Sequence, residues 1–178
     1  KLTIDFLKKH PHYDINKQYG PFLFTLLMIS AANNDQDLVK FLLEKKNINA
    51  KIKNKFGETV LVYVIRSRNR EMIKLLSNDM YSDKININDY QLHRSLTTGW
   101  ECYGPALSYA IEKKDPELVK LILNNKNVDV NINININKGL PIDFPDLNNF
   151  SPMNILCLSD RDDEITNLIL EYNKILNS

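Results

Sequence analysis

The sequence is poor in glycine, proline and cysteine, and each shortage excludes a class of protein. Its 5 Gly and 7 Pro are scattered over 178 residues, so the chain has no glycine-rich phosphate loop and no flexible linker between domains. Its two cysteines, Cys102 and Cys157, provide no disulfide framework, and we therefore expect an intracellular, cytoplasmic setting. No apolar run approaches the roughly 18 to 20 residues that a membrane-spanning helix requires, so we expect no membrane insertion.

The sequence also lacks an excess of either charge. Its 23 Lys and Arg against 22 Asp and Glu give a net charge of +1, which does not favour nucleic acid or a membrane surface as a partner. The 43% apolar and 25% charged content is ordinary for a folded chain. We expect a single elongated domain over residues 1–178. Because the first residues have the pattern of a truncated helix, we expect the chain to be a fragment of a longer protein.

One pattern recurs four times along the chain. A small or polar residue opens a short apolar run, and a second apolar run with helical spacing follows after a polar break. The paired runs are 25–31 with 38–43, 59–65 with 72–76, 105–111 with 118–123, and 151–157 with 165–170. Such a repeat is typical of a solenoid and not of a globule with an active-site cleft.

Each pair of runs predicts two short helices. In the second run, Leu38, Phe41 and Leu42 share one helical face, and neither helix buries its apolar stripe alone, so neighbouring units must stack. An acidic residue precedes each second run, where it faces the positive end of the helix dipole. These residues are Asp37, Glu71, Glu117 and Glu164.

Three short motifs recur within these units. Thr-Val-Leu-Val at 59–62 and Ser-Pro-Met-Asn at 151–154 open a first helix, and Asp-Leu-Val-Lys-Phe-Leu-Leu at 37–43 forms a second. Asp-Val-Asn or a close variant ends a unit at 14–16, 47–49 and 129–131. The units resemble the ankyrin repeat, which opens with T-P-L-H-x-A and has a period of about 33 residues. An unrelated array of helical hairpins is the alternative.

The resemblance implies an all-α solenoid of stacked helical hairpins with β-hairpin-like fingers. We expect a partial repeat at 1–16, repeats at 17–50, 51–88, 100–131 and 146–178, and long finger insertions at about 78–103 and 124–150. The family's glycine between the two helices is replaced by Asn34, Arg68 and Lys114, and a left-handed backbone suits Asn34 better than the other two. The family's histidine in the first helix is also absent.

No group of residues in the sequence predicts catalysis or a cofactor. The three histidines and two cysteines lack the spacing of metal ligands, and we find no nucleophile elbow. The acidic stretch 160–164 is either a contact for a cation or basic partner or, as we prefer, a turn with helix-start carboxylates. We therefore expect no enzyme activity, no small-molecule substrate, no cofactor and no metal.

Residues 128–137 alternate strictly between Val or Ile and a polar residue, mostly Asn. The pattern predicts an extended finger strand, which could pair with 85–88. A low-complexity loop and an exposed edge that recruits another chain are the alternatives. The single tryptophan, Trp100, is either an exposed contact for a partner or a plug inside the long insertion.

The resemblance implies a protein–protein interaction module that binds a protein partner through its concave surface and fingers. Mixed charge with interspersed aromatic residues suits a protein epitope better than a phosphate backbone. The expected contact residues are Lys55, Phe56, Glu58, Arg66, Ser67, Trp100, Tyr103, Glu112 and Lys113, with Ala32, Asn33, Leu147, Asn148 and Phe150 in the matching positions of the first and fourth repeats.

Three other functions remain open at this point. The chain could be the targeting segment of a larger effector protein whose catalytic domain lies outside it. It could bind nucleic acid through the basic residues at 51–55 and 66–70, although only Phe56 is close enough to stack on bases. It could also associate with itself through the finger rich in Asn and Ile.

Overall fold

The computed structural model describes residues 2–89, 91–94, 101–132, 135–136, 151–152 and 162–176. The chain forms two compact units, residues 1–86 and 87–178, and each is described here by itself. None of the helices in these described segments is long and apolar enough to cross a membrane.

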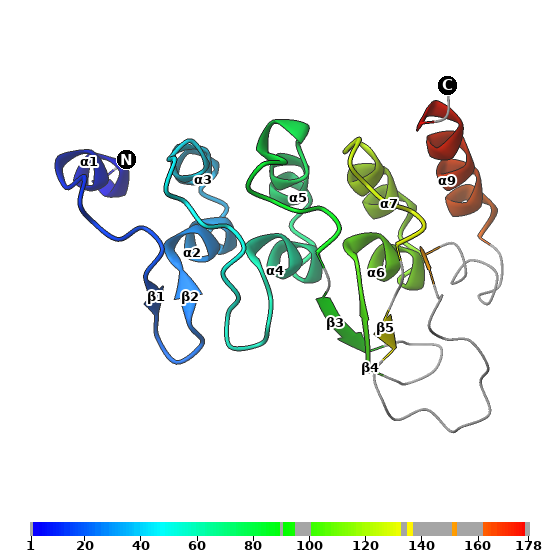
Figure 1. Ribbon diagram of the computed structural model, residues 1–178, viewed down its shortest axis with the longest axis horizontal. Coiled ribbons are helices and arrows are strands. Elements are labelled where there is room, and N and C mark those ends of the chain that lie inside the picture. The colour runs from blue at the N-terminus through cyan, green and yellow to red at the C-terminus, as the bar shows by residue number, and fades with distance from the viewer. Residues whose placement is uncertain are drawn as a thin grey trace. The chain divides into compact units, whose positions relative to one another are not determined.

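The first unit is a row of helical hairpins. Helix α1 (Leu2–Lys9) is followed by the hairpin β1 (Gln18–Tyr19) and β2 (Phe24–Thr25), and then by α2 (Leu26–Ala32) and α3 (Gln36–Leu43). Helices α4 (Val60–Arg66) and α5 (Arg70–Leu76) and the short 3-10 helix η1 (Asp79–Tyr81) complete it (Figure 1). Helix α1 packs on α3, and α2 packs on α4. The predicted stacking in chain order is confirmed for this unit.

The second unit begins with two strands, β3 (Gln91–Arg94) and β4 (Glu101–Gly104). The helical hairpin α6 (Ala106–Glu112) and α7 (Pro116–Leu123) follows, and α9 (Asp163–Leu176) packs on α7. Strand β4 lies between β3 and β5 (Asn135–Ile136), antiparallel to both. The repeats are thus helical, and short strands form in their fingers.

The second helix of each described hairpin begins with the same cap. The side chains of Asp35, Asn69 and Asp115 accept hydrogen bonds from backbone N–H groups three residues later, at 3.0, 3.1 and 3.0 Å. Because these N–H groups have no partner within the helix, the caps define where α3, α5 and α7 start. The predicted acidic residues 37, 71 and 117 lie in the first turn of these helices.

The turn between the two helices of each hairpin adopts the left-handed conformation that the sequence predicts. Asn34, Arg68 and Lys114 have φ angles of 56°, 56° and 49°. This conformation costs a residue with a side chain about 1–2 kcal/mol, and it persists because the helices on either side are packed. Arg68 and Lys114 therefore mark positions where the fold holds local strain.

The apolar faces of the helices form the core of each unit. In the first unit, Leu27, Leu42, Leu61 and Ile73 are at most 2% exposed. Burying one such side chain contributes about 2 kcal/mol. In the second unit the fully buried residues include Leu107, Ile111, Ile122, Ile165 and Ile169. Each helix thus buries its stripe against its neighbours, as the repeat pattern requires.

The prediction of a continuous strand over 128–137 is wrong for residues 128–132, because the chain turns at 130–131. The alternation itself is confirmed there, since Val128 and Val130 are buried while Asp129 and Asn131 are exposed. Of the residues that the structure describes in this stretch, 135–136 form a strand, and it pairs with β4 and not with 85–88, which contains no strand. Residues 133, 134 and 137 lie outside the described segments.

A side chain, and not a strand pair, joins 88 to the finger at 127–129. Asn88 Nδ2 donates to the carbonyl of Asn127 at 2.7 Å, and Asn88 Oδ1 accepts from the N–H of Asp129 at 2.9 Å. In the first unit, Asn16 bridges to Asn47 and Asn49 in the same way, at 2.7 and 2.8 Å. Asn16, which ends the motif at 14–16, and Asn88 therefore each link one finger to the next.

Candidate interaction surface

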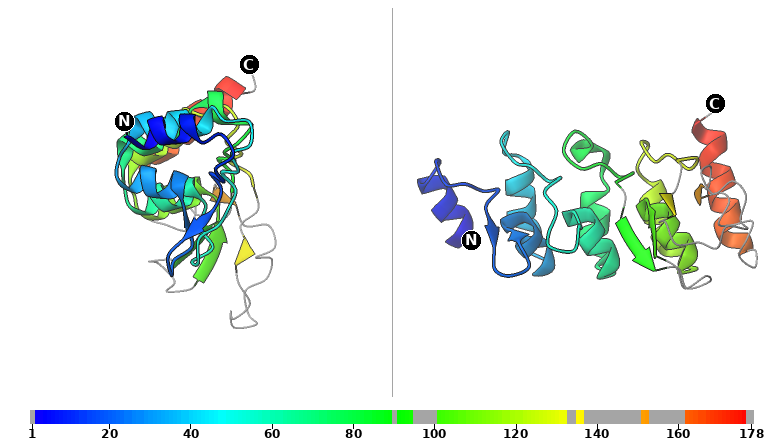
Figure 2. Two further views of the ribbon diagram at one scale, coloured as in Figure 1. Left: turned by 90° about the vertical axis from the view of Figure 1, so that its left-hand side faces the viewer. Right: turned by 60° about the horizontal axis from the view of Figure 1, so that its bottom comes forward.

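Two neighbouring fingers of the first unit expose apolar side chains at their tips. The β1–β2 hairpin and the loop at 54–58 project on the same side of α2 and α4 (Figures 1 and 2). Phe22, Leu23 and Phe56 are 47%, 44% and 49% exposed. Together with Lys55 and Arg66 they form what we call the finger patch.

The backbones of these two fingers are joined by hydrogen bonds. The N–H of Lys55 donates to the carbonyl of Phe22 at 2.9 Å. Gln18 Nε2 donates both to the carbonyl of Leu23 at 2.7 Å and to the carbonyl of Lys53 at 2.9 Å. The patch is therefore built on one connected frame, although its two halves lie about 33 residues apart in the sequence.

The aromatic rings of the patch form a continuous row. The centroids of Phe22 and Phe56 are 5.7 Å apart, and their planes are 25° from parallel. Phe22 lies 6.1 Å from Phe24, and Phe24 meets Tyr63 of α4 edge to face at 5.4 Å. Each such pair stabilises the fold by about 0.5–1.5 kcal/mol beyond the effect of burial, so the row holds the two fingers against α4.

Arg66 is held in place by a buried carboxylate. Glu58, only 5% exposed, accepts from Asn54 Nδ2 at 2.8 Å with one oxygen and pairs with Arg66 Nη1 at 2.9 Å with the other. The guanidinium carbon lies 5.8 Å from the centroid of the Phe56 ring. The Arg66 side chain remains 53% exposed, so part of its donor fork faces solvent.

The structure therefore changes the role expected for Glu58. The sequence placed it among residues that touch a partner, but its carboxylate is buried beneath Arg66 and satisfied by Asn54. Asn54 Oδ1 also accepts from the N–H groups of Phe56 and Glu58, which shapes the turn. Glu58 positions Arg66 and does not itself present a contact.

Leu23 occupies a backbone position that favours glycine. Its φ angle is 57°, in the left-handed region, and it stands two residues before Thr25. In the next finger, Gly57 stands two residues before Thr59 with a φ of 76°. The same turn therefore forms with glycine in one finger and with a strained leucine in the other, and the leucine side chain is exposed at the tip.

The remaining predicted contact residues are distributed over both units. Lys55 and Ser67 are exposed, and the Ser67 hydroxyl donates to the carbonyl of Val64 at 3.0 Å. In the second unit, Glu112 ends α6, and Lys113 Nζ lies 5.2 Å from the centroid of Tyr109.

The other predicted contacts lie in β4, at the end of α2 or outside the described residues. The backbone of Tyr103 lies in β4 opposite Leu92. Trp100, Leu147, Asn148 and Phe150 lie outside the described residues. Ala32 and Asn33 are exposed at the end of α2.

Sequence reasoning missed Phe22, Leu23 and Phe24. The available signal was Leu23, which stands where the equivalent position of the next repeat has glycine. Why these residues matter depends on the contact of Phe22 with Phe56, which no local pattern reveals.

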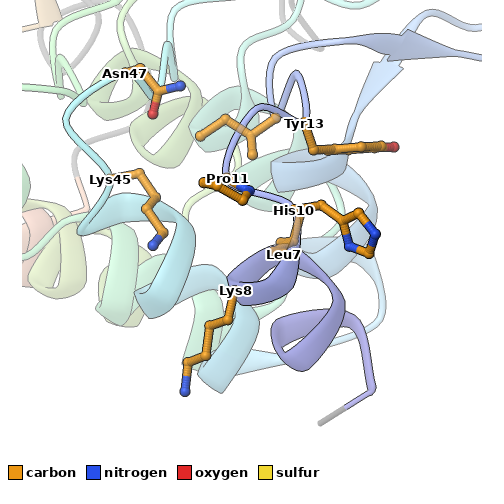
Figure 3. A pocket seen from close by; sticks show the side chains of 8 residues that line it. Leu7, Lys8, His10, Pro11, Tyr13, Lys45 and Asn47 are labelled. Atoms are coloured by element: carbon orange, nitrogen blue, oxygen red, sulfur yellow. The ribbon is translucent and has the colours of Figure 1, made fainter.

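A hollow of about 220 Å³ beside α1 is the other candidate site (Figure 3). The His10 ring turns away from Lys45, stacks on Phe6, and lies 2.8 Å from the Phe6 carbonyl through Nδ1. The Lys45 ammonium lies 4.1 Å from the centroid of the Phe41 ring. These polar groups of the hollow are therefore engaged elsewhere. Among the described residues, no cluster of three or more His, Cys, Asp or Glu side chains is able to hold a metal.

Comparison with known proteins agrees with the geometry. The family described as ankyrin repeats (3 copies) matches two overlapping stretches, residues 2–89 and 27–134. A protein of Acanthamoeba polyphaga mimivirus named "Putative ankyrin repeat protein L371" is 32% identical over 130 residues, which cover 68% of this chain. The same residues cover 16% of that relative, so this chain spans a small part of its length.

Proposed function

Because this chain belongs to the ankyrin repeat family, we propose that it binds a partner protein through the finger patch of its first unit and catalyses no reaction. Ankyrin repeats are generally protein-interaction modules, and the family is typically non-catalytic. The observation that carries the proposal is the exposure of Phe22, Leu23 and Phe56 on a frame that is held by hydrogen bonds.

The patch has the composition of a binding hot spot. Aromatic residues and arginine are enriched among the residues that contribute most to binding at protein interfaces, and an aromatic side chain buries a large area while ordering only about two rotatable bonds. Here Phe56 is stacked on Phe22, and Arg66 is oriented by Glu58, so little side-chain freedom remains to be lost on binding. A preorganised surface of this kind supports tight binding from a small area.

Capture of the partner by Phe56→Ala tests the proposal. Truncation of a hot-spot residue costs about 2 kcal/mol, so we expect about 30-fold weaker binding of the partner captured from the native cell. Met80→Ala is the matched control, because Met80 is an apolar side chain of the same unit, 68% exposed, in η1. Equal binding by Phe56→Ala and wild type would contradict the proposal.

Hydrogen exchange locates the contact independently of substitution. We expect the bound partner to slow exchange in the backbone at 20–24 and 54–58, since both segments lie at the finger tips. Protection confined to the outer helices α3 and α5 would place the partner elsewhere.

Tyr103, Glu112 and Lys113 remain proposed contacts of the second unit. Glu112 and Lys113 end the helix that corresponds to α4, at the positions of Arg66 and Ser67. Exchange of the two charges, Glu112→Lys with Lys113→Glu, keeps the net charge and tests whether this end of α6 also touches the partner.

A further inference from the structure

The finger patch carries positive charge that the first unit itself does not neutralise. Lys55 of the patch and Lys53, two residues before it, are exposed, and within the described part of the chain neither ammonium group has a carboxylate at ion-pair distance. The carboxylate of Glu58 beneath the patch is already paired with Arg66. A partner that covers the patch therefore meets the uncompensated charge of Lys55, the residue next to Phe56 in the chain.

Arg66 adds a directional donor to this charge. Only Nη1 pairs with Glu58, and the half-exposed side chain leaves other N–H groups toward solvent. A guanidinium fork matches the geometry of a carboxylate, and exclusion of water by neighbouring apolar groups strengthens such a pair. The patch thus offers a carboxylate a defined place next to Phe56.

Leu23 shows that the apolar part of the patch is not incidental. Gly57 proves that the same finger turn forms without a side chain at the equivalent position. A leucine there costs about 1–2 kcal/mol of backbone strain. Its side chain is nevertheless 44% exposed. The fold therefore tolerates backbone strain at a residue whose apolar side chain is only partly buried.

The ring geometry argues against nucleic acid as the partner. Proteins that bind single strands offer open aromatic faces on which bases stack. Phe56 instead stacks on Phe22 and lies beside the Arg66 guanidinium, so these rings are engaged with groups of the protein itself. The net charge of +1 provides no long-range attraction for a phosphate backbone.

We propose, building on the protein-binding function above, that the partner presents an extended segment in which a large apolar side chain is flanked by carboxylates. The apolar side chain packs against Phe22, Leu23 and Phe56, and the carboxylates pair with Lys55 and the exposed donors of Arg66. The patch then recognises its partner by both shape and charge, which gives it selectivity for acidic segments over neutral or basic ones.

Selection from random peptides displayed on phage tests this chemistry even while the partner is unidentified. The full chain serves as bait, and a Leu23→Gly, Phe56→Ala double variant removes peptides that bind elsewhere. We expect the remaining peptides to share an aromatic or long aliphatic residue next to Asp or Glu. Remaining peptides that are neutral or basic, or the absence of any enrichment over the double variant, would overturn the proposal.

A selected peptide, once synthesised, allows the charge to be tested directly. We expect Lys55→Glu to weaken its binding by about tenfold and added salt to weaken it in wild type. Lys74→Glu, an equal charge change at an exposed residue of α5, should change binding by less than about twofold. Equal effects of the two substitutions would refute a local charge contact, and displacement of the peptide by a single-stranded oligonucleotide would identify the surface as a nucleic-acid site.

The outcomes separate this proposal from the broader one. If Phe56→Ala abolishes capture of the native partner but the bound segment of that partner has no carboxylate, the patch binds protein and the predicted chemistry is wrong. If Phe56→Ala leaves capture unchanged, the site itself is wrong and both proposals fail.

Discussion

Replacing Leu23 by glycine should weaken peptide binding by the first unit and leave the stability of that unit nearly unchanged. The substitution relieves the strain of a left-handed leucine, which is about 1–2 kcal/mol. The greater freedom of glycine in the unfolded chain destabilises the fold by about 0.5–1 kcal/mol. The side chain is 44% exposed, so its partial burial contributes about 1 kcal/mol more. These contributions nearly cancel, and we expect the free energy of unfolding to stay within about 1 kcal/mol of wild type.

Urea unfolding followed by circular dichroism measures this difference. Leu61→Ala gives the scale, because Leu61 is only 2% exposed and its truncation should cost about 2–5 kcal/mol. Binding of the selected peptide to Leu23→Gly should meanwhile fall by about fivefold or more, since one apolar wall of the patch is gone.

Gly57→Ala is the reciprocal control. A Cβ built on Gly57 meets no heavy atom within 4 Å, so its effect is limited to the backbone at φ 76°. We expect a destabilisation of about 1 kcal/mol without loss of peptide binding. A loss of more than about 2 kcal/mol in Leu23→Gly would show that Leu23 is a packing residue, and unchanged peptide binding would show that Leu23 is not part of the contact; either result would refute the reasoning.

Four further substitutions or conditions test the structure. Arg68→Gly should raise the free energy of unfolding by about 0.5–1 kcal/mol in urea, because it relieves a φ of 56°. Glu58→Ala should lower it by about 2 kcal/mol, since the buried amide of Asn54 loses its acceptor and Arg66 loses its ion pair. Tyr172→Phe should lower it by about 1 kcal/mol, because the hydroxyl shares its one proton between the buried carbonyls of Asn125 and Val128, and an unchanged urea midpoint would contradict this. Burial, the hydroxyl of Tyr13 and nearby negative charge raise the pKa of Tyr19 from 10.0 to about 12. The folded state therefore favours the neutral phenol, and the stability that Tyr19 contributes is complete below pH 10 and is lost as the pH rises toward 12. In a titration followed by tyrosinate absorbance, Tyr19 should ionise at a lower pH in Tyr13→Phe than in wild type.

The helical hairpins could be predicted from the sequence because their causes are local. The spacing of apolar residues predicts each helix, and Asp35, Asn69 and Asp115 cap the second helices within three residues. The left-handed turns at 34, 68 and 114 follow from the same repeat. The strand predicted over 128–137 failed in part because alternation reports which side chains are buried, and not whether the backbone pairs or turns.

The repeat and its family were thus determined by the sequence alone, since both depend on residues within one turn or one period. The finger patch was decided only by the tertiary structure. Phe22 meets Phe56, and Gln18 reaches Lys53, across distances in sequence that no local pattern encodes. Burial likewise depends on what a neighbouring repeat places above a side chain, and so Glu58 became the support for Arg66 while Leu23 became an exposed apolar tip.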